Sequence, residues 1–261
     1  MSTQLYNNQT DYRKDEQSLL SRGFALTYAF FAYAVGAGML FWFFFAAIGL
    51  APYSLSSIET GNFFQAMTIN TLLVVIFAVQ HTIMARKSFK QKWTQVIPAH
   101  LERSTFVLAA GICMGLILWF WQPLTGNVWA FENETIRFAL IGLAFAGVVY
   151  VLITSLVTNH FELFGIRQAW LHATGKPYTP LTFKRQWVYK YSRHPMMLGL
   201  LVVIWSTPDM SATRLILAML LTVYLFIGIQ FEEHGLIQEF GDKYQQYRKE
   251  IGMFLTFRKN D

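Results

Sequence analysis

Residues 24 to 50 read FALTYAFFAYAVGAGMLFWFFFAAIGL, a stretch of 27 residues without a charged side chain. A helix needs about 20 mostly apolar residues to cross the hydrocarbon core of a bilayer, so this stretch is long enough by itself. The chain of 261 residues is 54% hydrophobic and 14% charged. A soluble domain carries about 25% charged residues, and this chain has too few to cover a surface in water. The sequence therefore predicts an integral membrane protein.

Further apolar segments follow, at residues 66–79, 106–121, 136–157, 195–206 and 212–231. The segment 195–206 would extend only about 18 Å as a helix, which is too short for a hydrocarbon core of about 30 Å. We expect it to be a shortened span or half of a helical hairpin, with Pro208-Asp209 at the turn. The fold class predicted is an all-α, polytopic integral membrane helix bundle with five to six transmembrane segments.

Lys and Arg residues gather in alternate connections between these segments. The N-terminal tail holds three, residues 82–105 hold five, residues 158–194 hold six and the tail after Phe231 holds five, which is 19 of the 21 in the chain. Short loops rich in Lys and Arg stay on the cytoplasmic side. We therefore expect an even number of crossings, with both termini and the active site in the cytoplasm.

Two clusters of short polar side chains lie at the ends of apolar runs on this side. Gln80 and His81 end the second run, and they are too short to reach the membrane surface as Lys or Arg can. They are expected to face the bundle interior or a cavity. Asn159, His160 and Glu162 follow the fourth run, where they either cap the helix end or line a site.

Two amphipathic helices are expected outside the long runs. One is a short interfacial helix around residues 168–174. The other follows the last span on the cytoplasmic side, where it lies on the membrane or folds back over the inner face. Its apolar side chains recur at helical spacing; they are Leu236, Ile237, Phe240, Tyr244, Tyr247 and Ile251.

Adjacent acids, Glu232 and Glu233, lie where the last span reaches the membrane boundary, and Arg193 and His194 lie at the same depth. Carboxylates at such a boundary are unfavourable unless they are solvated, paired or bound to a cation. Two interpretations remain open. Either an Arg–Glu pair ties two helix ends together, or these groups line a pocket for a polar, partly cationic ligand.

Residues 193–199 read RHPMMLG and residues 232–247 read EEHGLIQEFGDKYQQY. At this separation the two motifs resemble the S-adenosylmethionine site of integral-membrane methyltransferases, a group that includes the isoprenylcysteine carboxyl methyltransferases and phospholipid methyltransferases. The resemblance implies S-adenosylmethionine as the cofactor. It also implies a set of cofactor-binding residues, namely Tyr189, Tyr191, Arg193, His194, Pro195, Met197, Gly199, Glu232, Glu233 and Leu236.

The chain departs from that group on the substrate side. Residues 187–189 read WVY in place of the usual Gly-Pro-Tyr, and Met197 replaces an aromatic residue. Residues 252–255 read GMFL in place of the terminal proline motif. We therefore expect a shared cofactor pocket and a different substrate.

Three motifs in the N-terminal part are similar to the bacterial NnrU-related branch, and over the whole length to membrane-bound methanethiol S-methyltransferases: QHTIMAR at 80–86, ERST at 102–105 and NHFELFGIRQ at 159–168. The resemblance implies methylation of methanethiol to dimethyl sulfide, by direct transfer to the thiolate, at the bacterial inner membrane and without a metal. A base or nearby positive charge must favour the thiolate. The catalytic candidates are His81 and His160 as bases and Arg103, with Arg86 and Arg167 as further electrostatic helpers. The candidates for substrate binding are Gln80, Asn159, Glu162 and Arg167.

On this interpretation residues 1–261 form a single membrane domain. A tail at 1–22 precedes four transmembrane helices in 23–157, and residues 158–261 contain the cofactor-binding loop, the helical hairpin and the C-terminal helix. The expected partners are a small thiol and the lipid bilayer, with no nucleic acid; the sequence does not define the oligomeric state. Two alternatives stay open: a prenyl-cysteine or lipid methyltransferase of the same superfamily, and a non-enzymatic haem-binding or accessory membrane protein of nitrogen-oxide metabolism.

Overall fold

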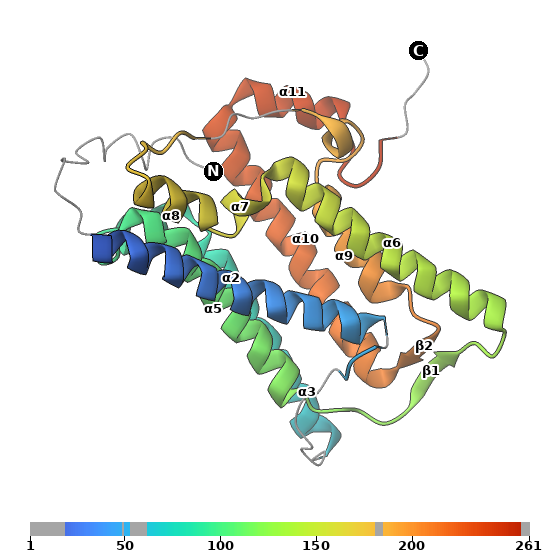
Figure 1. The fold of residues 1–261 in the computed structure, drawn as a ribbon. Helices are drawn as coiled ribbons and strands as arrows, with labels where there is room; N and C mark the ends of the chain where they lie inside the picture. Colours follow the sequence, from blue (N-terminus) through green and yellow to red (C-terminus); the bar gives the residue numbers. More distant parts are fainter. Residues whose placement is uncertain (1–18, 49, 53–61, 181–184, 257–261) are drawn as a thin grey trace. The chain divides into compact units, whose positions relative to one another are not determined.

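The computed structural model describes residues 19–48, 50–52, 62–180 and 185–256, so the expected tail lies outside it up to residue 18. Helices dominate this part of the chain, which confirms the all-α class (Figure 1). Within it, five helices are long and apolar enough to cross a membrane: α2 (Leu19–Ala47), α3 (Phe63–Met84), α5 (Ala99–Phe120), α6 (Glu134–Thr158) and α10 (Ala212–Phe240). The shorter apolar helix is α9 (Pro195–Trp205).

The long helices extend beyond the apolar runs at the ends that carry polar residues. In a bilayer, each backbone N–H and C=O must be satisfied within the segment, so a helix continues to the water boundary. As a result, His81 lies in the last turn of α3, Glu102 lies in the first turn of α5, and Glu233 lies inside α10. His81, Glu102 and Glu233 are therefore all held on helical backbone.

The chain divides into two compact units. One comprises residues 1–42, 75–117 and 159–182, and the other comprises residues 43–74, 118–158 and 183–261. The expectation of a single membrane domain stays a prediction.

In the first unit, α2 and α5 approach closely where both carry glycine. A Cβ at Gly111 would lie 2.8 Å from the Cα of Gly36. Small residues allow such close packing of membrane helices. The described residues of the same unit also form the short helices α4 (Lys87–Trp93), α7 (His160–Leu163) and α8 (Ile166–Ala173). Helix α8 confirms the short helix expected around 168–174 and begins two residues earlier.

In the second unit, α6 packs along α9 (Figure 1). The contact is made at glycines, because a Cβ at Gly199 would lie 2.7 Å from Cγ2 of Val151 and 3.1 Å from the carbonyl oxygen of Gly147. The short helix α9 is therefore held along a full-length span. Gly199, a residue of the cofactor motif, takes part in this helix packing.

The connection after α9 contains a strand that the sequence did not reveal. Strand β2 (Asp209–Ser211) pairs antiparallel with β1 (Asn127–Ala130), so the expected turn at Pro208-Asp209 leads directly into a two-stranded sheet. Asp209 also accepts two hydrogen bonds from Arg137, at 2.7 and 2.8 Å. This pair fastens the hairpin to the start of α6.

The C-terminal amphipathic helix differs from the expectation in extent. The single apolar face expected from Leu236 to Ile251 is divided between α10 and α11 (Asp242–Glu250), because Gly241 adopts φ 54° and ends α10. A positive φ is readily adopted only by glycine. Figure 1 shows α11 turning away from the end of α10. The apolar side chains of the two helices pack on each other around Tyr244, Tyr247 and Ile251.

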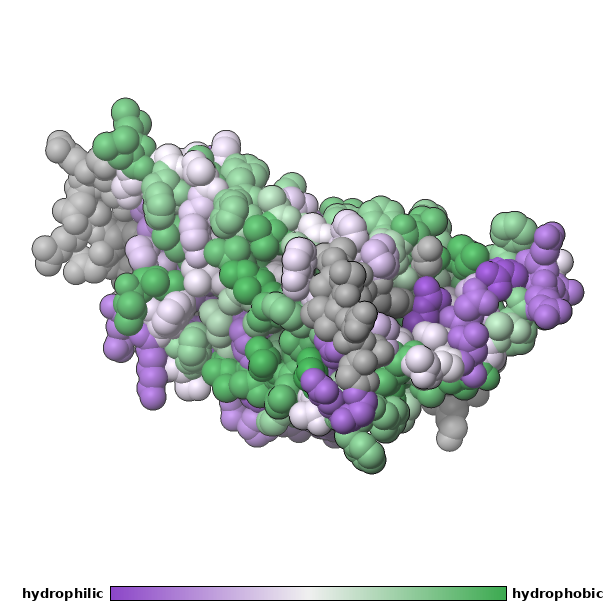
Figure 2. All heavy atoms as spheres, turned by 90° about the horizontal axis from the view of Figure 1, so that it is seen from below, coloured by the Kyte–Doolittle hydropathy of each residue, from purple (hydrophilic) through white to green (hydrophobic). Residues whose placement is uncertain are grey.

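The outer surface is apolar, as a bilayer requires. Phe64 is 80% exposed and Phe138 is 71% exposed. On the face drawn in Figure 2, hydrophobic side chains cover most of the described surface and hydrophilic ones gather in separate patches. Apolar exposure on this scale indicates contact with lipid. Together with the five long helices, it identifies a multi-pass membrane protein.

The glycine contact between α6 and α9 predicts a strong effect of one methyl group. In Gly147→Ala, the new Cβ would lie 2.9 Å from Cγ2 of Val203 and 3.0 Å from the carbonyl oxygen of Gly199. We expect a loss of about 1–3 kcal/mol in the free energy of unfolding, as for other overpacked sites. Thermal unfolding of the detergent-solubilised protein measures it. Gly142→Ala, on the same helix with open space around it, is the matched control; equal unfolding midpoints would contradict the prediction.

Candidate active site

The residues before α9 pair with the C-terminal segment of the chain. Pro195 begins α9, where a missing N–H removes no helical hydrogen bond. The backbone N–H groups of Arg193 and His194 donate to the carbonyl oxygens of Gly252 and Met253, at 3.1 and 3.0 Å. The Arg193-His194-Pro195 motif is thus held by the start of α9 and by the backbone of Gly252 and Met253.

A buried carboxylate, that of Glu233, lies at the centre of this site, and the residue is 3% exposed. Its Oε1 lies 2.9 Å from Nε of Arg193 and 3.1 Å from Nε2 of His194. Its Oε2 lies 3.0 Å from Nε of Arg248. The Arg193 contact is an ion pair whose N–H is not aligned for a hydrogen bond. A buried carboxylate needs such compensation, since desolvation costs several kcal/mol per ion.

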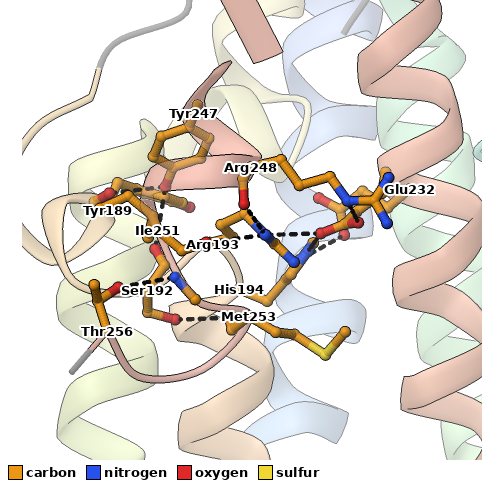
Figure 3. A network of polar contacts seen from close by, with 12 residues as sticks. Tyr189, Ser192, Arg193, His194, Glu232, Tyr247, Arg248, Ile251, Met253 and Thr256 are labelled. Carbon is orange, nitrogen blue, oxygen red and sulfur yellow. Dashed lines mark hydrogen bonds and ion pairs between the residues drawn. The ribbon is translucent and has the colours of Figure 1, made fainter. Parts of the chain in front are cut away.

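Arg193 is committed to the fold by further contacts. Its Nη1 donates to the carbonyl oxygens of Arg248 at 2.7 Å and Ile251 at 2.9 Å (Figure 3). These carbonyls end α11, where a cation is favoured by the helix dipole. Its side chain is 9% exposed. The geometry therefore favours the interpretation in which an Arg–Glu pair ties helix ends together, and contact of Arg193 with a cofactor stays a prediction.

Glu232 differs from its neighbour because its side chain is 47% exposed. Its Oε2 lies 3.6 Å from Nδ1 of His194, on the other side of the imidazole from Glu233. Burial lowers the pKa of His194, but hydrogen bonds and charges of Glu232 and Glu233 outweigh it and raise the pKa above its ordinary value. Glu232 thus presents a carboxylate at the edge of the site.

Tyrosine hydroxyls brace the loop before the motif, which contains the 3-10 helix η1 (Trp187–Lys190). The hydroxyl of Tyr247 donates to the carbonyl oxygens of Tyr189 at 2.7 Å and Ser192 at 3.2 Å. The hydroxyl of Tyr189 is hydrogen-bonded to Thr158 at 2.8 Å. Burial raises the pKa of both tyrosines, which keeps them protonated. Tyr191, by contrast, is 66% exposed.

In the first unit, the carboxylate of Glu162 is buried as well. Its Oε2 accepts a hydrogen bond from Arg167 at 2.8 Å, and its Oε1 accepts from Gln168 at 2.9 Å and Tyr178 at 2.6 Å. Its backbone N–H donates to the side chain of Asn159, the N-cap of α7. Three expected site residues, Asn159, Glu162 and Arg167, thus form one network with Gln168 and Tyr178, and this network joins α7 to α8. Substrate binding by Asn159, Glu162 and Arg167 stays a prediction.

The expected catalytic residues of this unit pack against aromatic rings: His81 and Arg103 against Phe106, and His160 against Phe164. The ring of His81 lies 4.9 Å from that of Phe106, between centroids, and Cζ of Arg103 lies 4.5 Å from the same centroid. Arg103 also donates from Nε to the carbonyl oxygen of Leu163 at 2.6 Å. His160 packs against Phe164, with ring centroids 4.7 Å apart. Gln80, next to His81, donates to the sulfur of Met84 on the following turn.

Known proteins of similar sequence identify the family. The chain is 39% identical over 250 residues to the methanethiol S-methyltransferase of Crocosphaera subtropica, which covers 92% of this chain and 94% of that protein. The chain belongs to the methanethiol S-methyltransferase family. It is also 43% identical over 196 residues to methanethiol S-methyltransferase 1 of Bradyrhizobium diazoefficiens, covering 75% of this chain and 69% of that protein. Nurim of Bos taurus is 29% identical over 172 residues, which cover 63% of this chain and 65% of that protein.

No family model matches the chain, and no solved structure matches it. For a member of the methanethiol S-methyltransferase family, the structure thus supplies contacts that the sequence similarity leaves undefined. It joins Arg193, His194, Glu232 and Glu233 in one cluster. Other expected cofactor residues lie near it on the same helices: Met197 is half-buried on α9, and Leu236 packs against the tyrosine cluster of α11.

Two residues of this methanethiol S-methyltransferase family member were missed in the sequence. Arg248 completes the environment of Glu233, and Tyr33 lies with its hydroxyl 3.0 Å from Nε2 of His160. The position of Arg248 depends on the turn at Gly241, which sequence periodicity does not reveal. Tyr33 does leave a signal, because a phenol hydroxyl inside an apolar run needs a hydrogen-bond partner.

His194 predicts a pH-dependent stability. The pKa of His194 is raised in the folded protein, so protonation of this residue stabilises the fold. The stabilisation is complete at pH values below the ordinary histidine pKa of about 6.5. It is lost as the pH rises through the pKa of the folded protein. We expect the unfolding midpoint of the wild type to exceed that of His194→Gln by more near pH 6 than near pH 9. Thermal unfolding at both pH values measures the difference. A gap that widens toward high pH would contradict the assigned charge environment.

Proposed function

We propose that this protein transfers a methyl group from S-adenosylmethionine to methanethiol and releases dimethyl sulfide and S-adenosylhomocysteine. Membership of the methanethiol S-methyltransferase family supports the reaction, with 39% identity over 92% of the chain. The observation that carries the cofactor assignment is the cluster around Glu233, in which two guanidinium groups contact Glu233 and the half-exposed carboxylate of Glu232 lies beside His194.

The residues of this cluster fit S-adenosylmethionine. The cofactor carries a sulfonium and an ammonium, which suit a carboxylate, and it carries a carboxylate, which suits a guanidinium. Glu232 provides the first kind of group at an exposed position, and the buried groups are already paired with one another. When bound, the cofactor supplies an electrophilic methyl group, whose bond to the sulfonium breaks as the bond to the thiolate sulfur forms.

The remaining chemistry is removal of the thiol proton, for which we propose His81 or His160 as the base. Burial lowers the pKa of His160, so its imidazole is neutral near pH 7 and able to accept a proton. Arg103 lies beside His81 on the ring of Phe106, where its charge favours the thiolate. Arg86 and Arg167 remain further candidates for that electrostatic role. Cation and anion combine in this reaction, so a site with little water avoids stabilising the separated charges.

We further propose that the reaction takes place on the cytoplasmic side of a bacterial inner membrane. The loops that carry the site residues hold most of the Lys and Arg in the chain, and such loops stay inside. A small apolar thiol can reach a site at this boundary from the bilayer or from water.

A direct assay tests the reaction. Purified protein is incubated with S-adenosylmethionine and methanethiol, and dimethyl sulfide is measured in the headspace. We expect product above that of a boiled control, and no methylation of a farnesylcysteine analogue offered in parallel. No dimethyl sulfide would refute the proposal. Methylation of the farnesylcysteine analogue would favour the prenyl-cysteine alternative, and a haem absorption band without product would favour the accessory-protein alternative.

The proposed bases predict a loss of turnover without a loss of cofactor affinity. His81→Gln and His160→Gln are compared with His100→Gln, a histidine on α5 outside the proposed machinery. Positioned acid–base groups contribute about 10²- to 10⁴-fold, so the variant that lacks the base should lose turnover in that range. Calorimetry should show an unchanged dissociation constant for S-adenosylmethionine. Wild-type turnover in both variants would exclude both histidines.

A further inference from the structure

The two arginines beside Glu233 are not equivalent. Arg193 is 9% exposed at its side chain and uses Nη1 for two backbone carbonyls as well as Nε for the ion pair. Arg248 is 48% exposed at its side chain and contacts Glu233 through Nε. Among the described residues, no hydrogen bond from either terminal nitrogen of Arg248 is found. The ion pair thus engages Nε of Arg248, while the side chain stays half exposed.

A hollow lies at this guanidinium. Its volume is about 490 Å³, and its lining consists of Ile237, Gln245, Arg248 and Lys249. Two cations, an amide and one aliphatic side chain therefore meet there. Figure 3 shows the Arg248 side chain extending toward Glu232. A half-exposed carboxylate and a half-exposed guanidinium thus lie at one edge of the cluster.

Glu232 and Arg248 are joined to the same cluster, through His194 and Glu233, and together they match the two charged groups of an α-amino acid. A guanidinium held through Nε offers its two terminal nitrogens to a carboxylate as a preformed fork. Glu232 can accept hydrogen bonds from an ammonium group, since only one of its oxygens lies near His194. A simple phosphate would find Arg248 and Lys249 attractive but Glu232 repulsive.

We propose that Arg248 binds the carboxylate, and Glu232 the ammonium, of the amino-acid end of S-adenosylmethionine. Lys249 adds positive charge at the rim of the hollow. Glu233 and Arg193 are positioning residues, which hold Arg248 and the end of α11 in place. This assignment rests on the proposed function and names the residues that recognise the cofactor there.

The test compares two ligands that differ only in the carboxylate. Calorimetry measures the dissociation constants of S-adenosylmethionine and of its decarboxylated form with the full-length wild type and with Arg248→Gln. In Arg248→Gln we expect roughly 10- to 100-fold weaker binding of S-adenosylmethionine, the size typical of a hydrogen bond to a charged group. Binding of the decarboxylated form should be unchanged. Glu232→Gln should weaken both ligands, because both keep the amine.

Lys243→Gln is the matched control. It removes the same charge from an exposed position of α11 that does not line the hollow, so neither dissociation constant should change. Thermal unfolding of each variant shows that the fold is retained. A lipid phosphate is a second source of an anion for the hollow. The measurements are therefore repeated in nanodiscs with and without phosphatidylglycerol, where the ligand-specific loss should persist.

Three results would overturn the assignment. Equal losses for both ligands in Arg248→Gln would mean that Arg248 acts only through Glu233. Unchanged affinity for both would mean that it does not touch the cofactor. A loss confined to nanodiscs that contain phosphatidylglycerol would assign the hollow to a lipid headgroup. A wild type that binds neither ligand would instead refute the proposed function itself, and this inference with it.

Discussion

The arrangement of the C-terminal part depends on one buried carboxylate, that of Glu233. A carboxylate removed from water is unfavourable by several kcal/mol unless cations and hydrogen-bond donors surround it. Arg193 comes from the start of α9, Arg248 from the end of α11, and Glu233 from α10. The three helices must therefore bring these side chains to the carboxylate of Glu233. The turn at Gly241 makes this possible, because it leads α11 back so that Arg248 meets Glu233.

The first unit uses a buried carboxylate in a different way. Both oxygens of Glu162 accept hydrogen bonds, and two of the donors, Gln168 and Tyr178, are neutral. The network joins two short helices, and the sequence neighbours of Glu162 are Phe161 and Leu163 rather than a second acid. The cluster at Glu233 has such an acid in Glu232. The two clusters therefore differ in exposure: Glu162 is buried with both oxygens paired, whereas the cluster at Glu233 also includes a carboxylate that is 47% exposed.

The apolar runs were sufficient to predict the long helices, because a bilayer leaves a spanning segment no other way to satisfy its backbone. The boundary at Gly241 and the pairing of β1 with β2 were not predictable, since each depends on contacts between distant segments. The motifs likewise predicted which residue types gather at the site. They could not show that Arg193 donates hydrogen bonds to backbone carbonyls, nor that Arg248 forms an ion pair with Glu233.

Helix geometry explains why two adjacent glutamates take different roles. Consecutive residues on an α-helix point about 100° apart, so both carboxylates cannot enter the same buried pocket. Within α10, Glu233 contacts the two arginines with a side chain 4% exposed, and Glu232 remains 47% exposed beside His194. The two adjacent acids of α10 are thus one buried carboxylate paired with arginines and one carboxylate that stays half exposed.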